Sequence, residues 1–291
     1  MEALLSVSFD NITSKDSSKV RKGLRQIEGL LAQICLSQKT DPAAAAKHKR
    51  NGSASKKSPS EPKALGALHG DPAFREFFRL QEGFEWNVAT RLIACLERLM
   101  GMGASGQSDV LILSVLDLLQ GALLLHPPSR ALFGREIYMN LLLDLLDCGE
   151  CPSIQSRSLL VLVTALLDTP SNTRTFESID GLLTVTSLFK SRSTGKAVKL
   201  QLMELFYFYL MHETPTIPAG AKGNSLGAER SSSQLALDRK PRDRRLSDPG
   251  QETRSVSEKQ ALLGRYIGNV DDLVQDLRDC TPFTTGISVA A

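Results

Sequence analysis

The sequence predicts an all-α protein built as an armadillo- or HEAT-like helical solenoid, and three observations favour that class. Aromatic residues make up only 5% of the chain, and the apolar residues are mostly aliphatic, which suits helix-on-helix packing. Apolar residues recur every three or four positions through most of the chain. Two Leu-rich hairpins, roughly 42 residues apart, each contain a Pro-Ser turn and then Phe133 or Phe176; such a period is typical of these repeats.

The N-terminal part of the solenoid is expected to cover residues 1–37. Between 14 and 36, Val20, Leu24, Ile27 and Leu31 share one face of an amphipathic helix, with Ser and Asp residues before them as capping candidates. Residues 38–71 are rich in Ala, Lys, Ser and Pro and nearly lack large apolar side chains. They cannot offset the entropy of ordering and are expected to form a disordered insertion.

The armadillo-like repeats are expected to cover residues 72–213. A helix pair should span 74–100 with a break at Gly83, and further helices are expected near 109–125, 135–146, 154–167, 176–189 and 196–211. The connections are short, which favours antiparallel neighbours stacked in order. Val, Leu and Thr are frequent in 161–164 and 182–186, so strands are the alternative there.

The C-terminal part should consist of a disordered basic linker, residues 214–257, and a final amphipathic helix, residues 258–280. Leu262, Leu263, Tyr266 and Ile267 begin the apolar stripe of that helix. The stripe would either pack back on the solenoid as a cap or bind a partner, and the sequence leaves both open.

Charge and cysteine content limit the partners and the compartment. The net charge is +3, but Lys and Arg concentrate in the two polar stretches and are not interleaved with aromatic residues, so no nucleic-acid partner is expected. The five cysteines are scattered and no secretory signal precedes them, which indicates reduced thiols in the cytoplasm or nucleus. The apolar runs are shorter than the roughly 18 residues that a membrane span needs, so no membrane insertion is expected.

No catalytic or metal-binding constellation is predicted, and the chain is not expected to be an enzyme or to hold a cofactor. The pair Cys148 and Cys151 stands alone, whereas a structural zinc site needs four ligands. Cys151 and Arg157 have the spacing of a cysteine-dependent phosphatase, the least favoured alternative. Glu150 would oppose the thiolate, and Ile154 stands where that loop needs glycine.

Two serines in the linker are candidate phosphosites, Ser247 and Ser257. Each follows an arginine by three residues, Arg244 and Arg254, a pattern that Arg-directed kinases read. Ser247 is also followed by Pro249, which resembles the phosphopeptide pattern bound by 14-3-3 adaptors. Phosphorylation would therefore create a site for such an adaptor.

Several longer stretches carry a family resemblance. They are 1–11, 17–26, Gly83-Phe84-Glu85-Trp86-Asn87, Leu125-His126-Pro127-Pro128-Ser129-Arg130, 172–177, 181–185 and Phe206-Tyr207-Phe208-Tyr209-Leu210. Together they resemble the fungal cell division control protein fourteen family of the septation initiation network, most like the members from filamentous ascomycetes. The resemblance covers nearly all of the chain outside the two polar stretches. It implies a non-catalytic subunit that binds a sterile-twenty-type protein kinase at the spindle pole body and promotes septum formation and cytokinesis.

The resemblance supplies no contact residues, so the partner surface has to be predicted from the repeats. Partners of armadillo stacks commonly lie along the concave face, near which polar residues interrupt the repeats. The candidates are Arg130, Arg135, Asn140, Asn172, Arg174 and Lys190. The alternative function is an armadillo-type adaptor for peptides or transport cargo, but such adaptors use a ladder of tryptophans and this chain has only Trp86.

Overall fold

The computed structural model describes residues 1–36, 63–101, 106–147, 151–213, 253–272 and 275. In these ranges the regular elements are helices: α1 (Glu2–Thr13), α2 (Ser17–Cys35), α4 (Leu65–Leu68), α5 (Pro72–Glu82), α6 (Val88–Gly101), α7 (Gly106–Leu125), the 3-10 helix η1 (Pro127–Gly134), α8 (Glu136–Asp147), α9 (Pro152–Leu166), α10 (Pro170–Ser178), α11 (Gly181–Lys190), α12 (Lys196–Leu210) and α13 (Val256–Gly264). This confirms the all-α class. The alternative of strands at 161–164 and 182–186 is wrong, because these residues lie in α9 and α11.

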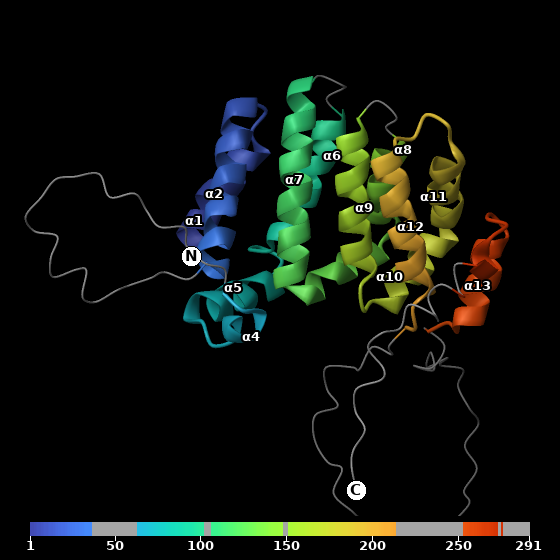
Figure 1. Cartoon of the computed structure of the whole chain (residues 1–291). Helices are drawn as coiled ribbons and strands as arrows, with labels where there is room; N and C mark the ends of the chain where they lie inside the picture. The colour runs from blue at the N-terminus through green and yellow to red at the C-terminus, as the bar shows by residue number, and fades with distance from the viewer. Residues whose placement is uncertain (37–62, 102–105, 148–150, 214–252, 273–274, 276–291) are drawn as a thin grey trace, which may run out of the picture.

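The helices form a stack of two layers. Helices α2, α7, α9 and α12 lie side by side in that order (Figure 1) and pack against one another. Helices α6, α8 and α11 form the second layer, each packed against its own neighbour in the first. Two successive units have the same order, since the short helices η1 and α10 are each followed by two longer ones. The armadillo subtype of this stack stays a prediction.

The Pro-Ser turns of the two hairpins are helix starts. Pro127 and Pro170 occupy the first turns of η1 and α10, where a residue without an N–H group costs no hydrogen bond. Phe133 and Phe176, which come after the turns, are 0% and 1% exposed and belong to the core. Each such side chain contributes about 2–3 kcal/mol when it is fully buried. The repeated pattern therefore marks equivalent core positions of successive units.

Buried polar side chains join neighbouring units. Asn87 Nδ2 donates to the carbonyl of Gln81 (2.7 Å) and to Ser129 Oγ (2.9 Å), 42 residues along the chain. Since the amide donates to that oxygen, the hydroxyl proton of Ser129 is free to bond His126 Nδ1, 2.8 Å away. Asn172 Nδ2 donates to the carbonyls of Arg130 (2.7 Å) and Ala165, again linking residues 42 apart. The repeat is thus present in the hydrogen bonds as well as in the apolar pattern.

The insertion ends before the predicted boundary at residue 71. Lys63 donates its backbone N–H to the carbonyl of Cys35 (2.8 Å), its ammonium to the carbonyl of Ile34 (3.0 Å), and forms an ion pair with Asp71. Leu68 is buried against the core. The prediction of disorder is therefore wrong for 63–71, where these few contacts hold a polar segment; residues 37–62 lie outside the described residues.

The final helix is shorter than predicted and starts earlier. Helix α13 begins after Ser255, which forms a capping box with Glu258, and ends at Gly264 instead of continuing to residue 280. After this break, residues 270–272 and 275 are again helical, and Leu263 and Val270 are both buried. The break comes at a glycine, which has a low helix propensity. The segment 253–272 packs on the end of the stack, against α12 (Figure 1), and residues 276–291 lie outside the part of the chain that the structure describes.

Among the described residues, one helix is long and apolar enough to span a membrane, contrary to the expectation from the sequence. Residues Ser108–Leu125 of α7 have a mean hydropathy of 1.8, so by length and composition they could cross a bilayer. The helix packs against α2, α6 and α9, and Val115, Leu116, Leu119 and Leu123 are fully buried. A central core helix meets the same criterion, because it is surrounded by apolar neighbours.

Candidate partner-binding site

Two of the six predicted surface residues lie inside the molecule. Arg130 is 7% exposed, and its guanidinium donates to the carbonyls of Leu123 (3.3 Å) and Leu167 (3.0 Å); burial lowers its pKa, opposed by the charge of Asp168. Asn172 is fully buried. The prediction that these two residues bind a partner is therefore wrong. They are polar because they satisfy carbonyls at helix ends, which would otherwise be buried without a donor.

The other four candidates lie on different elements: Arg135 between η1 and α8, Asn140 on α8, Arg174 on α10 and Lys190 on α11. Arg135, Asn140 and Lys190 are exposed, and Arg135 stacks 5.9 Å from the ring of Tyr138. Asn140 lines a groove of about 540 Å³ between α8, α9 and α11. Arg174 is mostly buried, in an ion pair with Glu213. Arg135, Asn140 and Lys190 stay predictions for a partner surface. Among the described residues, no contact joins these three side chains into one site.

A more continuous surface is formed by the outward faces of α7, α9 and α12. On α7 the exposed positions recur every seven residues, at Val110 (53% exposed), Asp117 and Leu124 (51%). On α12 the corresponding stripe includes Leu200, which is 63% exposed, and Met211 comes directly after the helix. We call the outward stripes of these three helices the row face. The exposed aliphatic side chains of this face lie on its two outer helices, α7 and α12, with α9 between them, and exposed apolar side chains gathered on one face are typical of protein interaction surfaces.

Charged residues on the row face pair with each other between helices. Arg157 Nε of α9 lies 3.2 Å from Asp117 Oδ1 of α7, and both side chains are about half exposed. Such a pair contributes little to stability in water. It fixes the position of the arginine, however, and directs its guanidinium towards α7. The row face therefore combines exposed aliphatic side chains with oriented charges.

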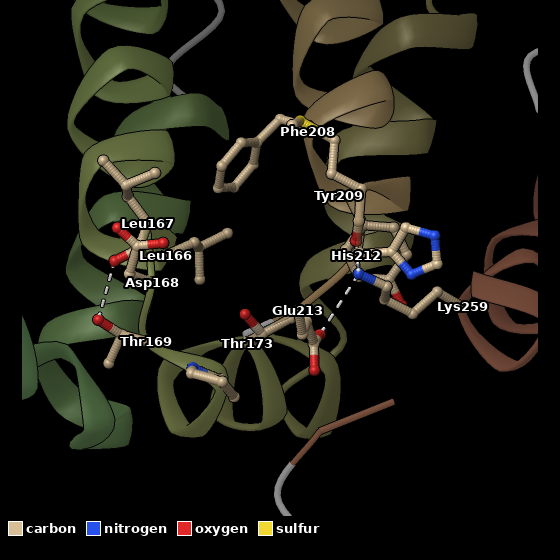
Figure 2. Close-up of a pocket in the computed structure, with 12 residues that line it drawn as sticks. Leu166, Leu167, Asp168, Thr169, Thr173, Phe208, Tyr209, His212, Glu213 and Lys259 are labelled. Atoms are coloured by element: carbon tan, nitrogen blue, oxygen red, sulfur yellow. Dashed lines mark hydrogen bonds and ion pairs between the residues drawn. The ribbon is translucent and has the colours of Figure 1, made fainter. Parts of the chain in front are cut away.

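At the C-terminal end of the row, a charged cluster holds the segment 253–272. Its members are Arg174, Glu177, Glu213, Arg254 and Lys259, and we call it the charged junction. Glu213 Oε1 lies 2.6 Å from Arg174 Nη2 and 3.5 Å from Lys259 Nζ, while Glu213 Oε2 accepts the backbone N–H of Arg254 at 2.8 Å. Figure 2 shows Lys259 reaching from α13 to Glu213, beside a cavity of about 100 Å³.

The second carboxylate of the charged junction is Glu177. Its Oε1 accepts the hydroxyl of Tyr209 at 2.7 Å and lies 3.2 Å from Arg174 Nη2, and its Oε2 lies 3.4 Å from Arg254 Nε. Two carboxylates of the stack thus meet one arginine from α10 and two cations from the C-terminal segment. Without that segment the stack would present two carboxylates against one guanidinium, so the junction is built to receive positive charge.

Burial changes the ionisation of the groups around the junction. Lys259 is 2% exposed, and its ammonium also donates to the carbonyl of Met211. Burial lowers the pKa of Lys259, and the charge of Glu213 opposes that change. The pKa of Tyr209 is raised by burial and by its hydrogen bond to Glu177, so the phenol stays protonated as the donor. Removing either partner of such a buried pair typically costs about 3–5 kcal/mol.

The geometry gives no support to phosphatase chemistry at Cys151. The residue precedes α9, with Pro152 in the first turn of that helix. Arg157, the arginine that the phosphatase spacing requires, is bound to Asp117 of α7. Within the ranges that the structure describes, no three His, Cys, Asp or Glu side chains are placed to hold a metal ion. Cys148, the other cysteine of the predicted pair, lies outside the described residues.

Most of the charged junction was not predicted from the sequence. Lys259 lies four residues before the buried Leu263, so it shares the inward face of α13, and a lysine on an apolar face is a signal for a buried ion pair. Glu177 and Glu213 carry no such signal, because a single glutamate at a helix end is ordinary.

Of the two candidate phosphosites, Ser257 is exposed in the first turn of α13, and Ser247 lies outside the described residues.

Known proteins resemble this chain over nearly its whole length. Residues 1–283 match the family model described as cell division control protein 14, SIN component, where SIN is the septation initiation network. The chain is 26% identical, over 292 aligned positions and 97% of both chains, to cell division control protein 14 of the fission yeast Schizosaccharomyces pombe. No solved structure matches it. These matches confirm the resemblance of the sequence motifs, and the chain belongs to the cell division control protein 14 family of septation initiation network components.

Proposed function

We propose that this protein is a non-catalytic scaffold subunit that binds and activates a sterile-twenty-type protein kinase in the septation initiation network. In this role it would promote septum formation and cytokinesis, acting in the cytoplasm and at the spindle pole body. Membership of the septation family supports the cellular process. The observation that carries the molecular role is the row face, an exposed surface that extends over α7, α9 and α12.

The proposed mechanism is a shift of the kinase's conformational equilibrium. A scaffold that contacts the active arrangement of a kinase domain more favourably than the inactive one raises the active population by that difference in binding free energy. The stacked helices suit this role, because each unit is tied to the next by buried hydrogen bonds such as that from Asn87 to Ser129. A stiff row holds its exposed side chains at fixed spacing along the partner.

The test is co-purification of the tagged protein from dividing fungal cells, with mass spectrometry of the proteins that remain after a moderate salt wash. Recovery of a sterile-twenty-type kinase in stoichiometric amount is expected. The variant Leu200→Glu places a charge on the row face and should reduce the recovered kinase by roughly ten- to a hundredfold, the effect of an unpaired charge buried in an interface. Ile137→Glu is the matched control, since Ile137 is 62% exposed but lies on α8 of the second layer.

Three outcomes would contradict the proposal. Equal kinase recovery with both variants would place the contact outside the row face. Recovery of importins or cargo without a kinase would favour the alternative of a transport adaptor. Phosphatase activity that is lost in Cys151→Ser would favour an enzyme.

A further inference from the structure

Ser257 and the arginine that precedes it are held in different ways by the docked C-terminal segment. Ser257 is exposed in the first turn of α13, and its Oγ lies 3.0 Å from Ser255 Oγ. Arg254 is engaged at both ends: its backbone N–H donates to Glu213 (2.8 Å) and its Nε lies 3.4 Å from Glu177. The serine is therefore open to solvent, while its recognition arginine is bound to the stack.

An Arg-directed protein kinase needs Arg254 free of the stack and Ser257 in an extended segment. Such a kinase binds the guanidinium three residues before the serine with its own carboxylates and holds the substrate as an extended chain. In the docked segment the Arg254 side chain, 37% exposed, is paired through Nε with Glu177 at 3.4 Å, and the serine lies within a helical turn. We propose that Ser257 is a phosphorylation site for an Arg-directed kinase, and that docking of the segment 253–264 at the charged junction blocks it because Glu177 and the kinase compete for Arg254.

The docked segment is well anchored, so undocking should limit the rate at which Ser257 is phosphorylated. Lys259 and Leu263 are 2% and 0% exposed, and Lys259 is bound to Glu213 and to the carbonyl of Met211. These contacts have to break before the segment can extend. The rate of modification then depends on the small undocked population instead of the exposure of the Ser257 hydroxyl itself.

Phosphorylation should in turn weaken docking. The γ-phosphoryl group of ATP is transferred to Ser257 Oγ: the bond to ADP breaks, the new P–O bond forms, and the hydroxyl proton passes to the catalytic base of the kinase. The product carries a charge of roughly −1.5 to −2 in the first turn of α13. That charge favours the helical turn itself, so the loss of docking comes from the contacts to the stack, where the phosphate competes with Glu177 for Arg254. It also repels Glu258, whose Oε2 lies 2.8 Å from Ser255 Oγ in the capping box.

The chain contains an internal control for the test. Ser247 also comes three residues after an arginine, and it lies outside the docked segment. The purified full-length protein is treated with an Arg-directed kinase and ATP, and the initial rates at both serines are measured by mass spectrometry. Synthetic peptides covering 240–252 and 250–262 give the intrinsic ratio of the two rates. In the intact protein the Ser257/Ser247 ratio should be about tenfold below the peptide ratio, the effect of a docked population near 90%.

Two variants release Arg254 in different ways. Lys259→Ala removes the buried anchor, and Glu177→Gln removes the charge that holds Arg254 while keeping an oxygen for the hydroxyl of Tyr209. Both should restore the ratio to within about twofold of the peptide value. Lys196→Ala, an exposed lysine at the opposite end of α12, should leave the ratio low. Hydrogen exchange of α9 shows whether each variant keeps the stack folded. If Lys259→Ala unfolds the stack, the result for Glu177→Gln decides the test.

Hydrogen exchange on the phosphorylated protein tests the reverse effect. Residues 256–263 should exchange faster after stoichiometric modification of Ser257, while α9 should be unchanged. The proposal is overturned if the intact protein already shows the peptide ratio, if both variants keep the low ratio, or if phosphorylation leaves the protection of 256–263 unaltered. The outcome does not depend on the partner proposed above, because only the purified chain and a reagent kinase are present.

Discussion

The amide nitrogen of Asn172 lies 2.7 Å from the carbonyl oxygen of Arg130 and donates to it from inside the core, 42 residues further along the chain. The same nitrogen also bonds the carbonyl of Ala165 at 2.6 Å. One side chain of α10 thus satisfies two backbone carbonyls of the preceding unit, one in η1 and one in α9. The link has the same separation in sequence as the bond from Asn87 to Ser129, so the stack is joined by polar contacts at regular intervals.

Replacing this link should destabilise the stack. Asn172→Ala leaves two buried carbonyls without their donor, and we expect the free energy of unfolding to fall by about 2–4 kcal/mol. Urea denaturation monitored by circular dichroism measures the change. Asn140→Ala is the control, because Asn140 is exposed and its loss should cost less than about 0.5 kcal/mol. Equal effects of the two substitutions would contradict a structural role for Asn172.

Two glycines of α2 should respond in opposite ways to the same substitution. A Cβ on Gly23 would lie 2.7 Å from Ile12 Cγ2 and 2.8 Å from the carbonyl oxygen of Ser8, so Gly23→Ala would push α1 away. We expect a loss of roughly 1–3 kcal/mol in unfolding free energy. Around Gly29 nothing lies within 4 Å of the added atom, and Gly29→Ala should stabilise the helix by about 0.5–1 kcal/mol. Thermal melts of both variants give the signs, and a stabilising Gly23→Ala would contradict the close packing of α1 on α2.

Acidification should destabilise the protein through His126. Burial lowers the pKa of this imidazole from its ordinary value of 6.5 to about 4. The unfolded chain therefore binds a proton before the folded protein does. The contribution of His126 to stability is complete above pH 6.5 and is lost as the pH falls from there towards 4, at a limiting slope of about 1.4 kcal/mol per pH unit.

The variant His126→Gln isolates this effect. Glutamine does not titrate, and its carbonyl can accept the hydroxyl of Ser129 in place of Nδ1. Chemical denaturation at pH 7, 6 and 5 should show a smaller loss of stability for the variant than for the unchanged protein. Parallel pH profiles would mean that other groups cause the acid sensitivity.

Substitution of Cys151 should have little effect on stability or on septum formation. The thiol caps no helix through its side chain, and Arg157 is bound to Asp117. We expect Cys151→Ser to change the free energy of unfolding by less than about 0.5 kcal/mol. Septum formation in cells that carry only this variant should be normal. Loss of septation by a stably folded Cys151→Ser protein would require chemistry at the thiol.

The sequence predicts those parts of the fold that depend on apolar periodicity. Phe133 and Phe176 recur after helix starts marked by proline, and both positions are buried. The family could also be recognised from the sequence, because long motifs are spread over nearly the whole chain. Helix ends were less predictable: the apolar stripe continues past Gly264, whereas α13 does not.

Buried polar residues explain most of the errors at the candidate site. Arg130 and Asn172 look like surface residues because polarity alone does not distinguish solvent from a buried carbonyl as the hydrogen-bond partner. The charged junction brings together α10, the end of α12 and a segment more than 40 residues further on. That proximity is a property of the folded chain, and no local pattern encodes it.

Two hydrogen bonds donated by backbone N–H groups also determine how easily the chain can lengthen by insertion. Lys63 bonds the carbonyl of Cys35, and the N–H of Arg254 bonds the carboxylate of Glu213, so the chain leaves the stack and returns to it at nearly the same point in both places. Doubling the number of residues between two joined points of a chain costs only about 0.6 kcal/mol in closure free energy. The number of residues between 36 and 63 and between 213 and 254 can therefore change by many positions at little thermodynamic cost to the stack. Evolution can add recognition sequences there without altering the helices to which they are tethered.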